Sequence, residues 1–452
     1  MQNYPQWLQG LKNPVFARLY LAQTINLVGE SLTWLGLALL AFELAGAQAS
    51  VILATALTLR VMTFVVLSPL AGAIADQVNR KHLMIATHLA RMVIVCCLPF
   101  INQTWQIYAI VLSLNLFYAF FTPTYKATIP LVTSETECPK AIALSSATYQ
   151  LLGVLGPGLA GGIAAWVGTR QVFFLDGVTF LVAACLIATL PGQCLTVQNT
   201  QETRTVAKVW ANIKMGTTCL FRDPPIRYAL VLQLIAAIAG AAVLVNTVNY
   251  VQGILELGKV EYGWVMAAFG IGATLASVGL GNARQSLSPI VLTSVGAVLI
   301  TLALFAANLM NLFGLLVLWA IAGVGQTLVD VPTQTLIADR VSTEAQGRVY
   351  GAHFAWSHLW WAFAYPLAGW LGTALPHQSF FYGSLLGLAL LVVVYVVFNP
   401  RQLTPLQPGV WHDHDHHHDH HHQHHHSVNG VMTRLHNHLH FHPKSGSSLE
   451  PG

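Results

Sequence analysis

The chain has 452 residues, of which 55% are hydrophobic and only 8% are charged, and its mean hydropathy is +0.58. Soluble domains carry about 25% charged residues, so this composition excludes an ordinary globular enzyme, a disordered chain and a nucleic-acid binder that relies on a basic surface. The net charge of +4 is too small to indicate an acidic partner. Of the 20 histidines, 15 lie between His412 and His442. The sequence therefore combines a long apolar body with a short histidine-rich tail.

Twelve apolar stretches are long enough to cross a bilayer, which takes about 20 residues in a helix. They cover residues 16–42, 51–74, 82–101, 105–126, 141–166, 171–190, 226–252, 261–281, 289–307, 312–336, 349–372 and 379–398. We predict an all-α integral membrane protein with twelve transmembrane helices in two pseudo-symmetric six-helix bundles. The predicted parts are an N-terminal bundle (1–190), a central cytoplasmic loop (191–225), a C-terminal bundle (226–400) and a disordered cytoplasmic tail (401–452).

The basic residues predict how the chain crosses the membrane. If the N-terminus is cytoplasmic, 17 of the 21 lysines and arginines lie on the cytoplasmic side, and only Arg170 and Lys259 lie on the other side. Cytoplasmic loops carry an excess of lysine and arginine, so both termini are predicted to be cytoplasmic. We expect a multi-pass protein of the bacterial inner membrane.

The loop after the second stretch carries a recognisable pattern. Gly72 is followed by Asp76 and then by the basic pair Arg80 and Lys81. This pattern resembles the signature of the major facilitator superfamily, a family of transporters with two six-helix halves. Asn79 stands where the signature usually has glycine, and this replacement is tolerable because asparagine also accepts left-handed backbone angles.

The fifth stretch is rich in small residues around Gly156 and Pro157. This segment resembles the glycine-proline motif of antiporters in the same superfamily, although its spacing differs from the usual one. Small residues let helices approach closely, and proline allows bending, so simple helix packing explains the motif equally well.

The tail predicts metal binding. Neutral imidazole binds borderline divalent metals such as Ni²⁺, Co²⁺, Cu²⁺ and Zn²⁺, and most histidines are neutral at pH 7. The histidines of the tail are His412, His414, His416, His417, His418, His420, His421, His422, His424, His425, His426, His436, His438, His440 and His442. A major facilitator body with such a tail resembles the nickel-resistance exporters of bacteria. The resemblance implies efflux of Ni²⁺ and a tail that gathers or senses the ion; imidazole chemistry alone does not select nickel.

Ionisable residues inside membrane spans are costly and usually functional. Gln23, Asn26 and Glu30 share one helical face, which predicts a polar stripe facing a cavity or a partner helix. We expect Glu30 to handle a cation or a proton, or else to form a structural ion pair. The other candidates are its possible counter-charges Arg60 and Arg91, and Asp176 and Asp330, which lie near the ends of predicted spans and are expected at the interface.

His353 and His358 are weaker candidates, because five residues turn an α-helix by about 140° and direct the two side chains to different sides. The sequence has no GxxxxGK[ST] phosphate loop, so we expect secondary transport coupled to protons, without enzymatic activity or a resident cofactor.

Two alternatives remain open at this point. One is an exporter of a siderophore, a drug or a metal chelate, and the other is a membrane-tethered metal sensor or buffer. The expected partners are metal ions and the lipid bilayer, with no nucleic acid, and the chain is expected to function as a monomer.

Overall fold

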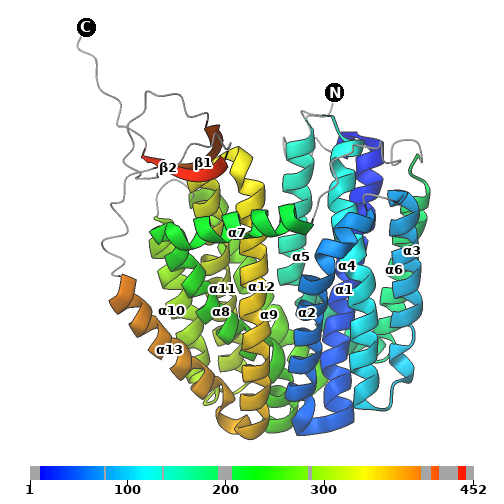
Figure 1. The fold of residues 1–452 in the computed structure, drawn as a ribbon. Coiled ribbons are helices and arrows are strands. Elements are labelled where there is room, and N and C mark those ends of the chain that lie inside the picture. The colour runs from blue at the N-terminus through cyan, green and yellow to red at the C-terminus, as the bar shows by residue number, and fades with distance from the viewer. Residues whose placement is uncertain are drawn as a thin grey trace.

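The computed structural model describes residues 11–75, 78–134, 137–191, 206–283, 288–398, 409–416 and 436–443 (Figure 1). The first six long helices are α1 (Pro14–Ala45), α2 (Ala49–Ala75), α3 (Arg80–Val95), α4 (Thr104–Val132), α5 (Cys138–Val167) and α6 (Val172–Ala188). The last six are α8 (Pro224–Val248), α9 (Lys259–Ala283), α10 (Pro289–Ala307), α11 (Leu312–Arg340), α12 (Thr343–Ala374) and α13 (Ser379–Phe398). Each of the twelve predicted spans coincides with one of these helices.

The apolar character of the helices explains the architecture. In the described part of the chain, 8 helical segments are long and apolar enough to cross a membrane, and α6 is a shorter apolar helix. Large hydrophobic side chains cover their outer surfaces, including Trp166 and Val396, which are 89% and 73% exposed. Such a surface is stable next to lipid, so the protein is a multi-pass membrane protein.

The two sets of six helices pack in the same pattern. In the first set, α1 packs on α5 and α6, α2 on α4, and α3 on α4 and α6. In the second set, α8 packs on α12 and α13, α9 on α11, and α10 on α11 and α13. Between the sets, α2 packs on α12 and α5 packs on α9. The prediction of two pseudo-symmetric six-helix bundles is therefore confirmed.

Helix α7 (Val206–Arg222) lies within the segment that we predicted as a loop. Figure 1 shows it crossing the C-terminal bundle, at the end of the molecule where α1 begins; we call this the α7 end. The backbone of Gly216 touches α12 so closely that an added Cβ would lie 2.4 Å from the carbonyl oxygen of Arg348. Trp356 Nε1 donates a hydrogen bond to Thr217 Oγ1 at 3.2 Å. Helix α7 is therefore attached to the C-terminal bundle.

The basic pair before α3 forms contacts within the N-terminal bundle. Arg80 Nη1 donates to the carbonyl oxygen of Ala127 on α4 at 2.8 Å, and Lys81 Nζ donates to that of Leu190 after α6 at 2.7 Å. Asn79 does not use left-handed angles: its φ is −62°, and its side chain accepts hydrogen bonds from the backbone N–H of Lys81 and His82. Asparagine is favoured there because it caps the N-terminus of α3.

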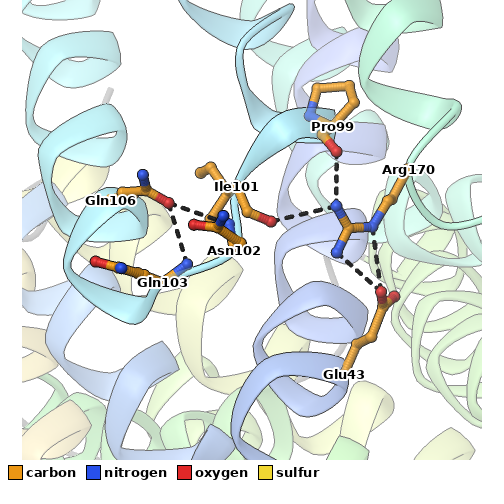
Figure 2. A network of polar contacts seen from close by, with 7 residues as sticks. All are labelled: Glu43, Pro99, Ile101, Asn102, Gln103, Gln106 and Arg170. Carbon is orange, nitrogen blue, oxygen red and sulfur yellow. Dashed lines mark hydrogen bonds and ion pairs between the residues drawn. The ribbon is translucent and has the colours of Figure 1, made fainter.

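The opposite end of the N-terminal bundle is held by Arg170 (Figure 2). Its guanidinium forms an ion pair with Glu43 at the end of α1, at 3.0 Å. It also donates hydrogen bonds to the carbonyl oxygens of Pro99, at 2.7 Å, and Ile101, at 3.2 Å, in the connection between α3 and α4. One side chain thus connects three segments.

The two bundles meet at this opposite end. The backbones of Gly161 on α5 and Gly263 on α9 touch, because a Cβ added to Gly161 would lie 2.4 Å from Cα of Gly263. Asn249 Nδ2, just after α8, donates to the carbonyl oxygen of Ala47 at 2.7 Å and to Ser50 Oγ at 2.8 Å. Small residues and short polar side chains therefore join the bundles at the end away from α7.

The tail contains an antiparallel pair of strands, β1 (Gly409–His416) and β2 (His436–Pro443). This differs from the predicted disordered tail. Strand β1 lies against α11 and α12, and β2 lies against α7, so the pair sits at the α7 end (Figure 1). The other tail histidines, between residues 417 and 435, lie outside the described residues.

Candidate functional site

The N-terminal bundle contains an ion pair in the middle of its helices. Arg60 Nη2 on α2 lies 2.7 Å from Glu30 Oε1 on α1. The guanidinium of Arg60 also stacks over the ring of Trp34, at 4.5 Å from the ring centre. The Glu30 side chain is 13% exposed and that of Arg60 is 27% exposed. This pair is therefore within reach of water, and Arg60 is the counter-charge of Glu30.

A second arginine lies deeper in the same bundle. Arg91 on α3 is 4% exposed, and its guanidinium lies between the rings of Phe180, at 4.3 Å, and Tyr118, at 4.9 Å. Its Nη1 lies 3.4 Å from Oδ1 of Asn26, which is fully buried. Arg91 interacts electrostatically with both Glu30 and Asp176. It therefore shares its positive charge between two acids.

Asp176 lies inside the protein. It is 1% exposed and accepts hydrogen bonds from the hydroxyls of Thr33, at 2.5 Å, and Thr179, at 2.9 Å. Helix α1 approaches α6 closely at Gly29, where an added Cβ would lie 2.1 Å from Oδ1 of Asp176. This close packing covers the carboxylate although it is near the beginning of α6. That Asp176 lies at the membrane interface stays a prediction.

Three charged residues of the N-terminal bundle line one cavity. Its walls include Glu30, Arg91 and Asp176, together with Thr33, Trp34, Asn115, Tyr118 and Phe180. Among the described residues, Glu30 Oε2 and Arg91 Nε are buried without a hydrogen-bond partner. Buried polar atoms are costly when unpaired, so these atoms mark a place for water or a ligand. We call Glu30, Arg60, Arg91 and Asp176 the N-cluster.

The C-terminal bundle has a polar cluster of a different kind. Asp330 on α11 accepts hydrogen bonds from Gln326 Nε2 at 2.8 Å and from Gln233 Nε2 on α8 at 3.2 Å. Gln233 Oε1 in turn lies 2.8 Å from His353 Nε2 on α12. Gln233 is 6% exposed and His353 is 7% exposed. We call these four residues the C-cluster.

The C-cluster lacks the arginine that characterises the N-cluster. None of the ion pairs found among the described residues includes Asp330. Gln326 Oε1 is buried and has no hydrogen-bond partner in the described part. Within the described residues, a carboxylate, an imidazole and amide groups therefore meet across three helices, and the carboxylate has no ion-pair partner there. That Asp330 lies at the membrane interface stays a prediction.

The comparisons with known proteins agree with this architecture. A family model described as Major Facilitator Superfamily matches residues 19–255 and 229–416. The chain belongs to the Major Facilitator Superfamily. YfiS of Bacillus subtilis (strain 168), an uncharacterized transporter of this superfamily, is 28% identical over 347 residues, which cover 73% of this chain and 80% of that protein.

A shorter similarity concerns an efflux pump. The multi-drug resistance efflux pump PmrA of Streptococcus pneumoniae serotype 4 is 30% identical over 132 residues, 29% of this chain and 33% of the pump. The chain thus matches about a third of that relative.

Solved structures show the same superfamily fold. A bacterial homologue of the human lysosomal transporter Spinster, in an inward-facing and unoccupied conformation, matches with a TM-score of 0.66 at 13% sequence identity, covering 87% of this chain and 98% of that one. The nucleoside transporter NupG matches with a TM-score of 0.64 at 11% identity, covering 85% and 99%. These structures agree with the family match, which shows that the chain is a membrane transporter of the major facilitator type.

The structure places the remaining superfamily motifs in different ways. Gly72 lies in the last turn of α2, and Asp76 lies outside the described residues. Gly156 touches α1, since an added Cβ would lie 2.0 Å from Ser31 Oγ. Pro157 lies within α5, which continues through it. Close packing of α1 and α5 therefore accounts for Gly156.

The histidines of α12 have different neighbours, as their spacing indicates. His353 contacts Gln233, whereas the ring of His358 lies 6.2 Å from the ring of Phe64 on α2. Gln23 is half-buried, and its Oε1 has no partner among the described residues. Among the residues that the structure describes, no group of three or more His, Cys, Asp or Glu side chains is placed to hold a metal ion.

Sequence reasoning missed Gln233, Gln326 and the aromatic rings around Arg91. Polar amides inside an apolar span were the available signal for the two glutamines, because such groups need partners in lipid. This signal does not reveal which side chain each glutamine contacts. Gln233 and Asp330 are 97 residues apart, so only the packing of α8 on α11 brings them together.

Proposed function

We propose that this transporter exports divalent metal cations, nickel foremost, from the bacterial cytoplasm across the inner membrane in exchange for protons. Three features support the proposal. The superfamily carries out transport, the tail is rich in metal-binding imidazole, and the bundle interiors contain two separate polar clusters. The resemblance to nickel-resistance exporters favours nickel among the borderline metals.

The proposed orientation follows from the basic residues. The positive-inside rule puts the α7 end on the cytoplasmic side, because basic residues such as Arg80, Lys81 and Arg340 lie at helix ends there. The contact of Gly161 with Gly263 is then on the outer side. In this orientation the bundles meet on the outside, which is how an alternating-access transporter receives cargo from the cytoplasm.

We assign the two clusters different tasks. The C-cluster would hold the dication, because Asp330, His353 and the amide oxygens of Gln233 and Gln326 are suitable ligands. Among the described residues, no arginine forms an ion pair with Asp330, so no such cation competes with the metal ion. The N-cluster would hold the proton. Glu30 is paired with Arg60 when it is ionised, and protonation of Glu30 would release Arg60.

The observation that carries the proposal is the Asp330 carboxylate, which belongs to none of the ion pairs found among the described residues and is joined through Gln233 to His353. It is tested by uptake of radioactive Ni²⁺ into everted inner-membrane vesicles in which an acid interior supplies the proton gradient. Asp330→Asn keeps the size of the side chain and should abolish uptake. Glu43→Gln is the matched control, since Glu43 is in the exposed pair with Arg170. Normal uptake by Asp330→Asn would refute the assignment of the dication site.

Glu30 is tested in the same vesicles. Glu30→Gln should stop uptake driven by the pH gradient but leave exchange of labelled for unlabelled Ni²⁺ intact, because exchange needs the cargo site without net proton movement. A variant that retains gradient-driven uptake would contradict the proton assignment. Expression of each variant in the membrane is measured alongside.

A second candidate cargo is organic: a drug, a siderophore or a metal chelate. The similarity to the efflux pump PmrA and the aromatic rings of Trp34, Tyr118 and Phe180 around the cavity favour it. Wild-type vesicles that extrude an organic dye but take up none of Ni²⁺, Co²⁺, Zn²⁺ and Cu²⁺ would support this candidate. A membrane-tethered metal buffer would instead lower free metal in cells without any uptake by vesicles.

A further inference from the structure

Lys126 is a cation on a membrane-spanning helix, and it has no role in the transport proposed above. It lies about two turns before Val132, where α4 ends beside the beginning of α1. Its side chain is exposed, and its Nζ lies 5.9 Å from the centre of the ring of Phe354 on α12. Because α12 belongs to the other bundle, Lys126 lies on the face of the N-terminal bundle that is turned toward the C-terminal bundle.

Lys126 differs from the N-cluster in its charge balance. In the N-cluster two acids face two arginines, whereas none of the ion pairs found among the described residues includes Lys126. A charged side chain in a membrane span is costly and usually serves a function. The ring of Phe354 attracts the ammonium group only weakly, because a cation–π contact at an exposed site contributes little. The position therefore favours an anion as the partner of Lys126.

A histidine and an arginine add to the positive charge around this position. His358 on α12 interacts electrostatically with both Lys126 and Arg60. Its Nδ1 donates a hydrogen bond to the carbonyl oxygen of Phe354 at 2.8 Å, so Nε2 is the ring nitrogen that takes up a proton. Protonated Nε2 donates a hydrogen bond to an oxyanion. Helices α2, α4 and α12 thus bring together three groups that attract a negative charge.

Aromatic rings lie next to these three groups. Phe64 on α2 has its ring centre 5.4 Å from that of Phe354 and 5.9 Å from that of Tyr118. The ring of His358 lies 3.8 Å from that of Phe354, which is 37% exposed. An exposed ring beside a cation suits a ligand that joins a planar apolar body to an anionic group.

We propose that Lys126, Arg60 and His358, together with the rings of Phe64 and Phe354, form a subsite for a small aromatic carboxylate between the two bundles. The direct contact falls to Lys126, because Arg60 is paired with Glu30. A single unmatched cation balances a carboxylate better than it balances a doubly charged phosphate. This subsite goes beyond the proposed metal transport and does not depend on it, since an anion and a dication need opposite ligands.

The first test measures whether the ligand must be an anion. The full chain is purified into nanodiscs of phosphatidylcholine, a lipid without net charge, and radiolabelled 1-naphthoate is the probe. The competitors are unlabelled 1-naphthoate, 1-naphthalenemethanol and 1-naphthylmethylamine, which have nearly the same shape and differ in charge. Naphthoate should displace the label at a concentration about tenfold or more below that of the alcohol, because hydrogen bonds between charged groups are the stronger ones. Absence of saturable binding, or equal displacement by all three compounds, would overturn the proposal.

The second test locates the site by removing single charges. Lys126→Met keeps the length of the side chain and should weaken binding of the probe about tenfold or more. Lys259→Met is the matched control, because Lys259 is an exposed lysine at the beginning of α9, at the opposite end of the molecule, and its loss should leave the affinity unchanged. Lys126→Arg should keep most of the affinity, which separates loss of charge from loss of folding. Equal affinities of Lys126→Met and Lys259→Met would overturn the proposal.

The aromatic part of the subsite is tested by a matched pair of phenylalanine variants. Phe354→Leu should weaken binding of the probe several-fold, because the ring that faces the planar body is lost. Phe313→Leu should have no effect, because this ring is 74% exposed at the beginning of α11, away from Lys126. Equal affinities of the two variants would contradict an aromatic ligand.

An anionic lipid also joins a negative group to an apolar body, and it is the competing occupant. Nanodiscs that contain phosphatidylglycerol distinguish the two, since the affinity for the probe should be the same in both kinds of disc. A tenfold loss of affinity in the phosphatidylglycerol discs would assign Lys126 to a lipid headgroup and overturn the proposal. Because every readout is binding, a failure here leaves the vesicle experiments on metal transport unaffected.

Discussion

The two bundles have the same helix packing but hold their buried polar groups in different ways. In the N-cluster, Glu30 and Asp176 face Arg60 and Arg91, so two acids are matched by two cations. In the C-cluster, Asp330 is held by the amides of two glutamines, and a histidine completes the group. The repeated architecture therefore does not impose repeated chemistry.

The difference teaches how each cluster responds to a change of charge. Removing one member of a buried ion pair leaves an uncompensated charge, which costs several kcal/mol. A contact between a glutamine amide and a carboxylate tolerates neutralisation of the carboxylate, because the amide can either donate or accept a hydrogen bond. We therefore expect the N-cluster to be sensitive to substitution through folding, and the C-cluster to be sensitive mainly through transport.

The largest expected effect is that of Arg91→Leu. It leaves Glu30 and Asp176 with one cation fewer, and should lower the free energy of unfolding by about 3–5 kcal/mol. Thermal unfolding of the purified protein in detergent measures the loss. Adding Asp176→Asn to the same chain should recover part of it, because one buried charge is then removed. A melting temperature equal to that of the wild type would show that Arg91 does not balance these acids.

The next effect concerns the contact that joins the bundles. Gly161→Leu places a side chain against the backbone of Gly263 and should reduce vesicle uptake roughly a hundredfold, since small misplacements of packed elements can cost that much. Gly162→Leu is the matched control, because an added Cβ at Gly162 meets nothing within 4 Å. Equal uptake by the two variants would mean that this contact plays no part in alternating access, in which the clusters are exposed first to one side of the membrane and then to the other.

Asp330→Asn should change stability much less than Arg91→Leu does. The substituted amide can still contact Gln233 and Gln326, so the free energy of unfolding should fall by about 1 kcal/mol or less. The same melting experiment measures it. A loss as large as that of Arg91→Leu would break the distinction between the clusters.

The smallest effect concerns α7, which packs on the C-terminal bundle. Burial, and then the nearby Asp223 carboxylate, raise the pKa of the Cys219 thiol to about 12, so Cys219 is protonated at neutral pH and should react slowly with a maleimide. Gly216→Leu should loosen α7 from Arg348 and increase the labelling rate several-fold. The exposed Cys97 is the internal reference, and an unchanged ratio of the two rates would show that Gly216 does not hold α7 in place.

The sequence predicts the helices well because lipid demands long apolar stretches, whatever their partners are. It does not predict α7, because α7 is a polar, amphipathic helix between the two bundles. Such a helix does not need the long apolar stretch that marks a membrane span. Glu30 could be identified as a candidate from its position alone, and Arg60 or Arg91 as its counter-charge. The choice of Arg60, and the burial of Asp176 at the close approach of α1 and α6, depend on how the helices pack.

The tail also shows that contacts between distant segments cannot be predicted from the sequence. Its composition predicts a disordered chelator, yet residues 436–442 alternate histidine with other residues at a period of two, which is the pattern of a strand. The matching strand 412–416 begins with the same alternation. The register between them could not be read from either segment, because pairing is a relation between the two.

The attachment of α7 has a consequence for how the chain can be divided. Its contacts run to α12, and Asp223 directly after it pairs with Arg340 on α11 at 2.8 Å. A gene split just before Val206 would therefore yield two polypeptides, each with a complete bundle. Helix α7 would remain on the same polypeptide as the C-terminal bundle that it contacts. Co-expressed, the two pieces should reassemble through the glycine contact at the opposite end, so each bundle could be mutated or labelled separately in a working transporter.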